Sequence, residues 1–152
     1  MKRNGKLSLA LHALGHMVGR AQPLTSDQIA LQNATNPVVV RRVLGQLRQA
    51  GIVRSDKGHA GGWRLARDAE TISLADVVRA LGDSVIPQPI SLGPSQCLIE
   101  QALHTYVDTA LAEAETVVMR RLEVQSIAQF ATGIAIDMSK AVALTPVEGD
   151  AK

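Results

Sequence analysis

Residues 36–66 read NPVVVRRVLGQLRQAGIVRSDKGHAGGWRLA, and the architecture of the chain follows from this segment. Asn36 is a residue type that caps helices, and Pro37 suits a first helical turn. Apolar residues then recur at helical spacing until Gly51, a residue that ends helices. Two short runs with strand character, IVR and WRL, follow on either side of a connection rich in glycine. The segment therefore predicts a helix followed at once by a β-hairpin.

The composition indicates a mostly helical chain with an aliphatic core. Of its 152 residues, 46% are hydrophobic but only 2% aromatic, which suits helices better than sandwiches. No run of about 18 uncharged apolar residues occurs, and the N-terminus continues into amphipathic sequence without a small-residue cleavage site. We therefore expect a soluble, cytoplasmic protein with no membrane partner. The single cysteine, Cys97, excludes an internal disulfide and a multi-thiolate zinc finger.

The charge is divided along the chain. Residues 36–67 carry seven basic residues and one acidic residue, a formal charge of +6, whereas residues 68–118 carry one basic and eight acidic residues, a formal charge of −7. The first segment suits a polyanion, and the second would be repelled by one. A solvated face is the usual explanation of scattered basic residues, but here they coincide with the predicted helix and hairpin. Nucleic acid is therefore the favoured partner.

Two further helices precede this unit. Thr25 and Gln28 have the spacing of a capping box and open a short helix, and a turn over residues 33–35 completes a helix-turn-helix. Amphipathic helix pairs are also common in proteins that do not bind DNA, so the helix-turn-helix pattern alone would be weak evidence for DNA binding. Before it, residues 6–19 predict a core helix with one apolar stripe made of Leu7, Leu11, Leu14 and Val18.

Winged helix-turn-helix proteins bind DNA through a helix that is followed by a basic hairpin, the wing. The helix enters the major groove, and the wing touches the backbone or the minor groove. Lys57 and His59 supply cationic or hydrogen-bonding groups at the tip, and Arg54 and Arg64 are expected to contact phosphates. Trp63 is expected to pack the hairpin onto the core. The connection also contains three glycines, which permit positive φ and let the backbone approach a phosphate closely. They are Gly58, Gly61 and Gly62.

The wing resembles a known signature. Two runs, LRQAGIVRS at residues 47–55 and KGHAGGWRLA at residues 57–66, resemble the Rrf2 family of bacterial winged-helix transcription regulators. The match continues through ISLADVVRAL at residues 72–81, reaches the segment that begins at Cys97 and covers roughly residues 6–130. The resemblance implies a mainly α fold with a small β-hairpin, in which a winged helix-turn-helix domain is followed by a long C-terminal dimerisation helix.

The resemblance also implies which side chains meet DNA. Family members read bases from the start of the recognition helix and from the wing, and the corresponding positions in this chain are Val38, Val39, Arg41 and Lys57. Some relatives have a hydroxyl and a carboxylate in place of Val38 and Arg41. Valine offers only apolar contact to a thymine methyl, whereas arginine prefers guanine O6 and N7, so the operator is expected to differ from theirs. The expected DNA-binding set is Asn36, Val38, Val39, Arg41, Arg42, Arg54, Lys57, Gly58 and His59.

Iron-sulfur members of the family hold three cysteines after the helix at residues 72–81. The last of these positions is Cys97, while counting back six and twelve residues gives Ser91 and Val85. Glu100 occupies the position where some relatives supply a histidine ligand. A cluster needs about four protein ligands, preferably thiolates, so we expect no cofactor and no iron-sulfur cluster, with the exception of one bridged between two subunits.

Two roles for Cys97 stay open. A thiol near a helix N-terminus has a lowered pKa, so a reactive thiolate that acts as a redox sensor is one interpretation. The other is a small buried residue retained for packing. His104 lies about 10 Å further along the predicted helix, too far for a Cys–His nucleophile pair.

Residues 96–125 predict one long helix whose apolar stripe exceeds what one small domain can cover. A partner subunit is the natural cover, and the family resemblance implies a two-fold homodimer through this helix. Two recognition helices would then meet successive major-groove faces of a pseudo-palindromic operator. The expected dimer-interface residues are Leu103, Val107, Leu111, Val118 and Leu122.

His12 and His16 have metal-ligand spacing, but no third ligand is in sight, and two ordinary helix histidines are the favoured interpretation. No enzyme is expected, because nucleophile, base and orienting group do not cluster. The sequence instead predicts a homodimeric regulator that binds double-stranded DNA, a repressor rather than an activator. Its signal would be an oxidant sensed through Cys97 or a small molecule. The alternative is a winged-helix protein-interaction module that does not bind duplex DNA.

The expected organisation has four parts. Residues 1–81 form the winged helix-turn-helix DNA-binding domain, and residues 82–95 form a loop. Residues 96–132 form the dimerisation helix and a short final helix, and residues 133–152 form a partly disordered tail.

Overall fold

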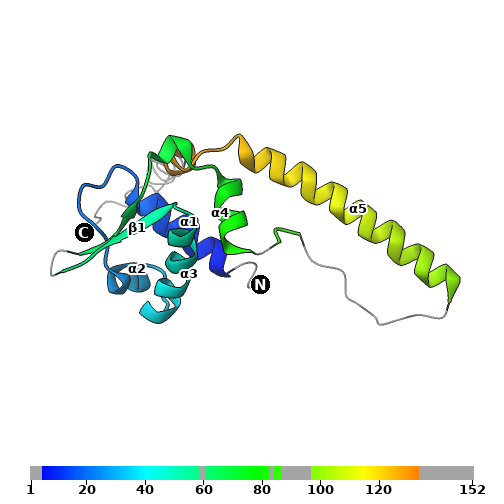
Figure 1. Cartoon of the computed structure of the whole chain (residues 1–152), viewed down its shortest axis with the longest axis horizontal. Helices are drawn as coiled ribbons and strands as arrows, with labels where there is room; N and C mark the ends of the chain where they lie inside the picture. Colours follow the sequence, from blue (N-terminus) through cyan, green and yellow to red (C-terminus); the bar gives the residue numbers. More distant parts are fainter. Residues whose placement is uncertain (1–4, 59–60, 83, 87–96, 134–152) are drawn as a thin grey trace, which may run out of the picture.

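The computed structural model describes residues 5–58, 61–82, 84–86 and 97–133. Within these ranges the chain is mostly helical, with one two-stranded antiparallel hairpin, as predicted. The helices α1 to α4 and the hairpin gather into a globular part, and the long helix α5 extends away from it (Figure 1). No helix within the described ranges has the length and apolar character needed to cross a membrane.

The elements follow one another in the order that the sequence predicts. A last helix begins at residue 127 and reaches the end of the described range at residue 133. The preceding elements are α1 (Gly5–Met17), α2 (Ser26–Gln32), α3 (Pro37–Gln49), β1 (Val53–Asp56), β2 (Gly62–Leu65), the 3-10 turn η1 (Ala69–Thr71), α4 (Leu74–Leu81) and α5 (Leu98–Glu123).

The helix-turn-helix is built by local capping. The Oγ1 of Thr25 accepts a hydrogen bond from the backbone N–H of Gln28 (3.2 Å), and the Oε1 of Gln28 accepts one from the backbone N–H of Thr25 (2.9 Å). At the start of α3, the Oδ1 of Asn36 accepts from the backbone N–H of Val38 (2.7 Å). Gly51, with φ of +70°, follows the end of α3 in the left-handed conformation that favours glycine. The predicted caps are therefore confirmed.

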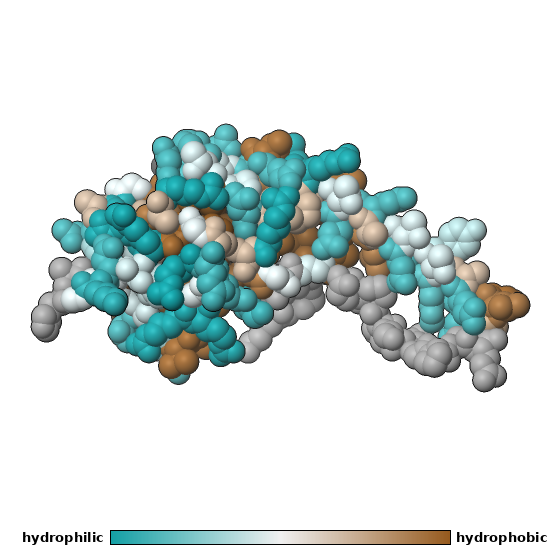
Figure 2. Space-filling model, in the orientation of Figure 1, coloured by the Kyte–Doolittle hydropathy of each residue, from teal (hydrophilic) through white to brown (hydrophobic). Residues whose placement is uncertain are grey.

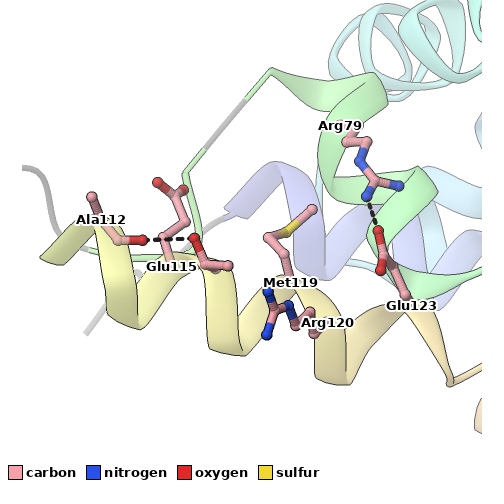
Figure 3. Close-up of a pocket in the computed structure, with 7 residues that line it drawn as sticks. Arg79, Ala112, Glu115, Met119, Arg120 and Glu123 are labelled. Atoms are coloured by element: carbon pink, nitrogen blue, oxygen red, sulfur yellow. Dashed lines mark hydrogen bonds and ion pairs between the residues drawn. The ribbon is translucent and has the colours of Figure 1, made fainter.

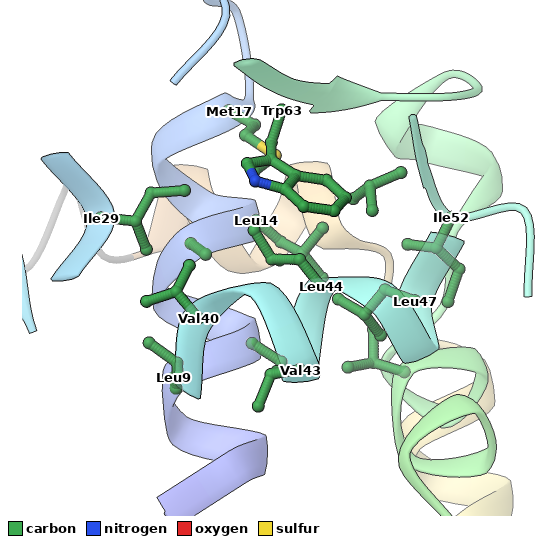
Figure 4. Packing of buried hydrophobic residues seen from close by; sticks show 14 of the residues in the cluster. Leu9, Leu14, Met17, Ile29, Val40, Val43, Leu44, Leu47, Ile52 and Trp63 are labelled. Atoms are coloured by element: carbon green, nitrogen blue, oxygen red, sulfur yellow. The ribbon is translucent and has the colours of Figure 1, made fainter. Parts of the chain in front are cut away.

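The core lies where α1, α3 and the hairpin meet (Figure 4). The predicted stripe on α1 was only partly right, because Leu14 is fully buried while Leu7, Leu11 and Val18 lie at the edge of the core. Both α3 and α4 pack against α1, and Ala10 and Ala13 take buried positions between larger side chains. The buried residues of α1 are Leu9, Ala10, Ala13, Leu14 and Met17.

The hairpin is attached to the core by Trp63. In its register Arg54 lies opposite Arg64, and Ser55 lies opposite Trp63. Leu24, from the loop before α2, adds an isolated bridge on the other side of β2, with backbone hydrogen bonds of 2.9 and 2.8 Å to Trp63. The indole Nε1–H of Trp63 donates to the Oγ of Ser26 (3.0 Å), and both residues are buried. The expectation that Trp63 anchors the wing to the core is confirmed.

After α5 the chain returns to the globular part. The backbone N–H of Leu74 donates to the carbonyl of Gln125 (2.9 Å), and that of Ile127 donates to the carbonyl of Ile72 (2.8 Å). Ile127 is fully buried in the core. The final helix, which we grouped with the dimerisation helix, therefore begins inside the core of the winged domain.

An open cleft separates α4 from the C-terminal half of α5 (Figure 3). An ion pair between Arg79 of α4 and Glu123 of α5 spans this region, and the Oγ of Ser84 donates to Glu115 (2.7 Å). These contacts fix one end of α5 to the globular part. No residue of α5 is buried.

Candidate nucleic-acid interface

The outer side of α3 presents three of the predicted DNA-binding side chains. Val38 is 59% exposed, and Arg41 and Arg42 are exposed as well. They lie at the N-terminal end of a helix whose opposite face is buried against α1 and α2. An apolar side chain and two guanidinium groups at the start of a presented helix can read base edges in a major groove.

Two other residues of the predicted DNA-binding set, Asn36 and Val39, have structural roles in α3 and the core. The side-chain oxygen of Asn36 is occupied by the backbone N–H of Val38, so it is a capping group first. Val39 is half-buried and packs against the core, which leaves only part of its side chain for a base. Val38 and Arg41 are therefore better placed to read sequence than Asn36 and Val39.

The wing is exposed, and its two arginines differ. Arg54, Lys57 and Gly58 are exposed, whereas His59 lies outside the described residues. Arg64 forms an ion pair with Asp56, with Nε 2.7 Å from Oδ2, so part of its charge is compensated within the hairpin. Arg54, which we grouped with Arg64 as a phosphate contact, has no carboxylate within ion-pair distance among the described residues.

The wing glycines are explained by the hairpin itself. Gly58 has φ of +100°, a conformation that residues other than glycine rarely adopt. A Cβ on Gly61 would lie 2.4 Å from the carbonyl oxygen of Asp56, and one on Gly62 would lie 2.8 Å from that of Leu24. We expected all three glycines to permit positive φ and approach to a phosphate. Gly62 does have a positive φ, of +159°, and for Gly61 and Gly62 the structure also gives a steric reason within the chain.

Five cations on α3 and the wing remain uncompensated. Of the seven basic residues between positions 36 and 67, Arg64 pairs with Asp56 and Arg67 pairs with Asp76 at 3.1 Å. Arg48, which we did not include in the DNA-binding set, donates to the Oγ of Ser55 on the wing (3.3 Å). Within the described residues no carboxylate pairs with Arg41, Arg42, Arg48, Arg54 or Lys57.

The exposure of the predicted dimer-interface residues differs along the length of α5. Leu103 and Val107 are 59% and 43% exposed. Leu111, Val118 and Leu122 are half-buried, and they share a helix face with Glu115, which is bonded to Ser84. Figure 2 shows apolar surface at the free end of α5. Four other apolar side chains of α5 are more exposed than the predicted interface residues, and the prediction did not include them. They are Leu98, Ile99, Tyr106 and Val117.

Cys97 lies at the N-cap of α5 and is exposed, so its interpretation as a buried packing residue is wrong. The backbone N–H groups of Glu100 and Ile99 hold the pKa of the Cys97 thiol below its usual value, because they stabilise the thiolate. A reactive thiol therefore remains consistent with the structure.

The residues present do not fit an iron-sulfur cluster. The four positions that the family resemblance implies for cluster ligands hold one thiol, one carboxylate, one hydroxyl and one isopropyl group in this chain. Ser91, one of the four, lies outside the described residues, but its side chain is no thiolate. A cluster needs about four ligands, mostly thiolates, and the chain contains one cysteine.

His12 and His16 lie together on the outer side of α1. Their Nε2 atoms are 2.8 Å apart, and their rings stack with centroids 4.7 Å apart. Burial, then the neighbouring His12 and Arg20, lower the pKa of His16. Within the described residues, no three His, Cys, Asp or Glu side chains group together in a way that could hold a metal ion.

Comparison with known proteins places these features in context. The model of the Rrf2 family, described as an iron-dependent transcriptional regulator, matches residues 3–133. The HTH-type protein YwnA of Bacillus subtilis is 38% identical over 78 residues, which cover 51% of this chain and 57% of YwnA. The HTH-type transcriptional regulator IscR of Vibrio vulnificus is 33% identical over 79 residues, which cover 52% of this chain and 44% of IscR. The chain thus spans about half the length of these curated relatives.

Solved structures show the same architecture over most of the chain. The oxidized form of CymR from Staphylococcus aureus superimposes with a TM-score of 0.59 and 25% identity, covering 86% of this chain and 96% of CymR. A protein from Lactobacillus plantarum superimposes with a TM-score of 0.69 at 20% identity, covering 90% of this chain and 97% of that chain. At that identity the second likeness concerns the fold alone.

Proposed function

The chain belongs to the Rrf2 family of transcriptional regulators, and from this premise we propose that it binds a specific pseudo-palindromic DNA site as a homodimer and represses the promoter that carries the site. The observation that carries the proposal is the set of five uncompensated cations on α3 and the wing. These cations lie on the two elements that a winged helix-turn-helix brings to a duplex. The segment 68–118, which follows in the sequence, has a formal charge of −7.

The division of roles follows from position. Val38 and Arg41 are at the exposed start of α3, so we assign them to base contacts together with the exposed Lys57 at the tip of the wing, whereas Arg54 on the wing contacts phosphates. A dimer that covers two successive major-groove faces would deny the polymerase access to the promoter. This is the physical reason for proposing repression.

Selection of duplexes from a random pool, followed by fluorescence anisotropy at increasing salt, tests DNA binding. We expect one enriched motif with two inverted half-sites, and an affinity that falls linearly in log–log coordinates with salt. An unenriched pool and no salt-dependent binding would favour the alternative, a protein-interaction module on the winged fold. Transcription in vitro from a promoter that contains the motif should fall when the protein is added, and a rise would contradict repression.

The dimer is proposed through α5. This helix has 26 residues, about 39 Å by helical rise, and buries none of them within its own chain. Its first half exposes large apolar side chains, among them Ile99 at 81% and Tyr106 at 77%. An exposed apolar stripe of this length is typical of a helix that packs against another subunit. A two-fold partner would place the same stripe opposite itself.

Sedimentation of the full chain separates this proposal from a monomer. We expect a dimer for the natural chain and a monomer for Leu103→Glu, because a carboxylate would be desolvated in an apolar interface. Thr105→Glu is the matched control, since Thr105 is exposed on the same helix and is polar. A Leu103→Glu variant that still sediments as a dimer would place the interface elsewhere.

We assign signal sensing to Cys97, because its thiol is exposed and its pKa is lowered by the α5 N-terminus. Attack of the thiolate on a peroxide oxygen would form a sulfenic acid and release hydroxide. Peroxide should then change the DNA affinity of the natural chain, and Cys97→Ser should bind DNA equally well yet ignore peroxide. If Cys97→Ser responds as the natural chain does, the thiol is not the sensor and a small-molecule signal becomes the remaining proposal.

A further inference from the structure

The histidine pair on α1 is a feature that the DNA-binding function does not use. His12 and His16 are one helical turn apart, so their side chains leave the same face of α1. Their Nε2 atoms approach to 2.8 Å, and their ring planes differ by 26°. One imidazole in its Nε2–H tautomer donates to the other in this arrangement. The two nitrogens therefore face one another across a single hydrogen bond, in a place that solvent reaches.

We propose that His12 and His16 form a two-histidine site for a divalent transition-metal ion of the Cu²⁺ or Ni²⁺ class. When a metal ion binds, the imidazole that donates the hydrogen bond would change to its Nδ1–H tautomer, so that both rings stay neutral and both Nε2 lone pairs bind the ion. This site is separate from the nucleic-acid interface, since it lies on the solvent side of α1 and not on α3 or the wing. It also reverses our expectation of two ordinary helix histidines, and the reason is the distance between the nitrogens.

The distance favours a right-angled pair of ligands. Imidazole nitrogens bind these metals at about 2.0 Å, so two of them at an angle of 90° lie about 2.8 Å apart, whereas a tetrahedral angle requires about 3.3 Å. The observed 2.8 Å is the length of the hydrogen bond between the imidazoles, and it equals the nitrogen separation in the square-planar or tetragonal geometry that Cu²⁺ and Ni²⁺ adopt with nitrogen ligands. The rings are exposed, so they can turn until both lone pairs point to the ion.

The neighbours of the pair affect how tightly it can hold an ion. The Arg20 guanidinium repels a metal cation as it repels a proton, which limits the affinity. No third protein ligand joins the pair within the described residues, so water fills the other positions.

Calorimetric titration of the full chain with NiCl₂ at pH 7.5 tests the site, in a Cys97→Ser background that removes the thiol as a ligand. We expect one Ni²⁺ per chain, and a loss on the order of 10²-fold in affinity for His12→Gln or His16→Gln, because each leaves a single imidazole. His104→Gln is the matched control, since it removes a histidine from α5 and should bind as before. Both His12 and His16 are exposed, and circular dichroism should show unchanged folding.

Two further results decide the outcome. At pH 5 protons compete for both imidazoles, so binding should weaken strongly. The Cu²⁺ complex should give an axial electron paramagnetic resonance spectrum with coupling to two imidazole nitrogens. Absence of Ni²⁺ binding by the parent chain, or equal binding by the His12→Gln/His16→Gln double variant, would overturn the proposal. Neither result would bear on DNA binding, which the anisotropy measurements test separately.

Discussion

Arg54 and Arg64 are cross-strand partners on the wing, and they should differ in their effect on DNA binding. Arg54 is exposed without a carboxylate partner among the described residues, whereas Arg64 is paired with Asp56 at 2.7 Å. Each phosphate contact contributes about 0.9 to the slope of log affinity against log salt concentration. In a dimer, Arg54→Ala removes two contacts, so the slope should become shallower by about 1.8. Arg64→Ala should change it much less, because its charge is already partly neutralised.

The assay is fluorescence anisotropy with one labelled duplex that carries the selected motif and one of random sequence, at salt concentrations between about 50 and 200 mM, the range in which the counterion effect is large. Arg54→Ala should weaken both duplexes by the same factor, because a phosphate contact carries no sequence information. Equal slope changes for Arg54→Ala and Arg64→Ala would refute the argument from charge compensation. An unchanged slope for Arg54→Ala would remove the wing from the phosphate contacts.

Four further substitutions test other positions. Arg41→Ala should cost about 1–3 kcal/mol on the selected motif and relax one base preference, while random DNA is less affected; equal losses on both would contradict its role as a base reader. Gly62→Ala should lower stability in thermal unfolding by about 1–3 kcal/mol, because the added Cβ would lie 2.8 Å from a backbone oxygen. Gly45→Ala, where nothing lies within 4 Å, should instead raise stability by about 0.5–1 kcal/mol. Ser26→Ala should cost about 1–3 kcal/mol in urea unfolding by leaving the buried Trp63 N–H without its acceptor, and no loss would mean that another group accepts it.

Features encoded within a few residues were predictable. The Asn36 cap reaches a backbone N–H two residues away, and the capping box joins Thr25 and Gln28. The left-handed residue after α3 is Gly51, as its type indicates. These interactions close within one helical turn, so residue identity and spacing suffice to predict them. The order of helices and hairpin, the basic surface and the family all follow from such local patterns.

Features that depend on distant neighbours needed the folded chain. The hairpin brings Asp56 beside Arg64 and neutralises part of its positive charge. The charge of Arg54 has no such partner among the described residues and stays available for a DNA phosphate. Gly62 must be glycine because Leu24, 38 positions earlier, passes alongside it. The burial of Ile127 also depends on distant neighbours, because the sequence predicts only a short final helix there, and the structure places Ile127 fully buried in the core.

Sequence alone thus determined which elements form, where they are capped and which segment carries the positive charge, since those properties reside in neighbouring residues. Tertiary structure decided which cations stay uncompensated, that Cys97 is exposed and that two imidazole nitrogens of α1 lie 2.8 Å apart. Exposure and distance depend on how separate parts of the chain pack and how side chains turn, and no local pattern encodes them.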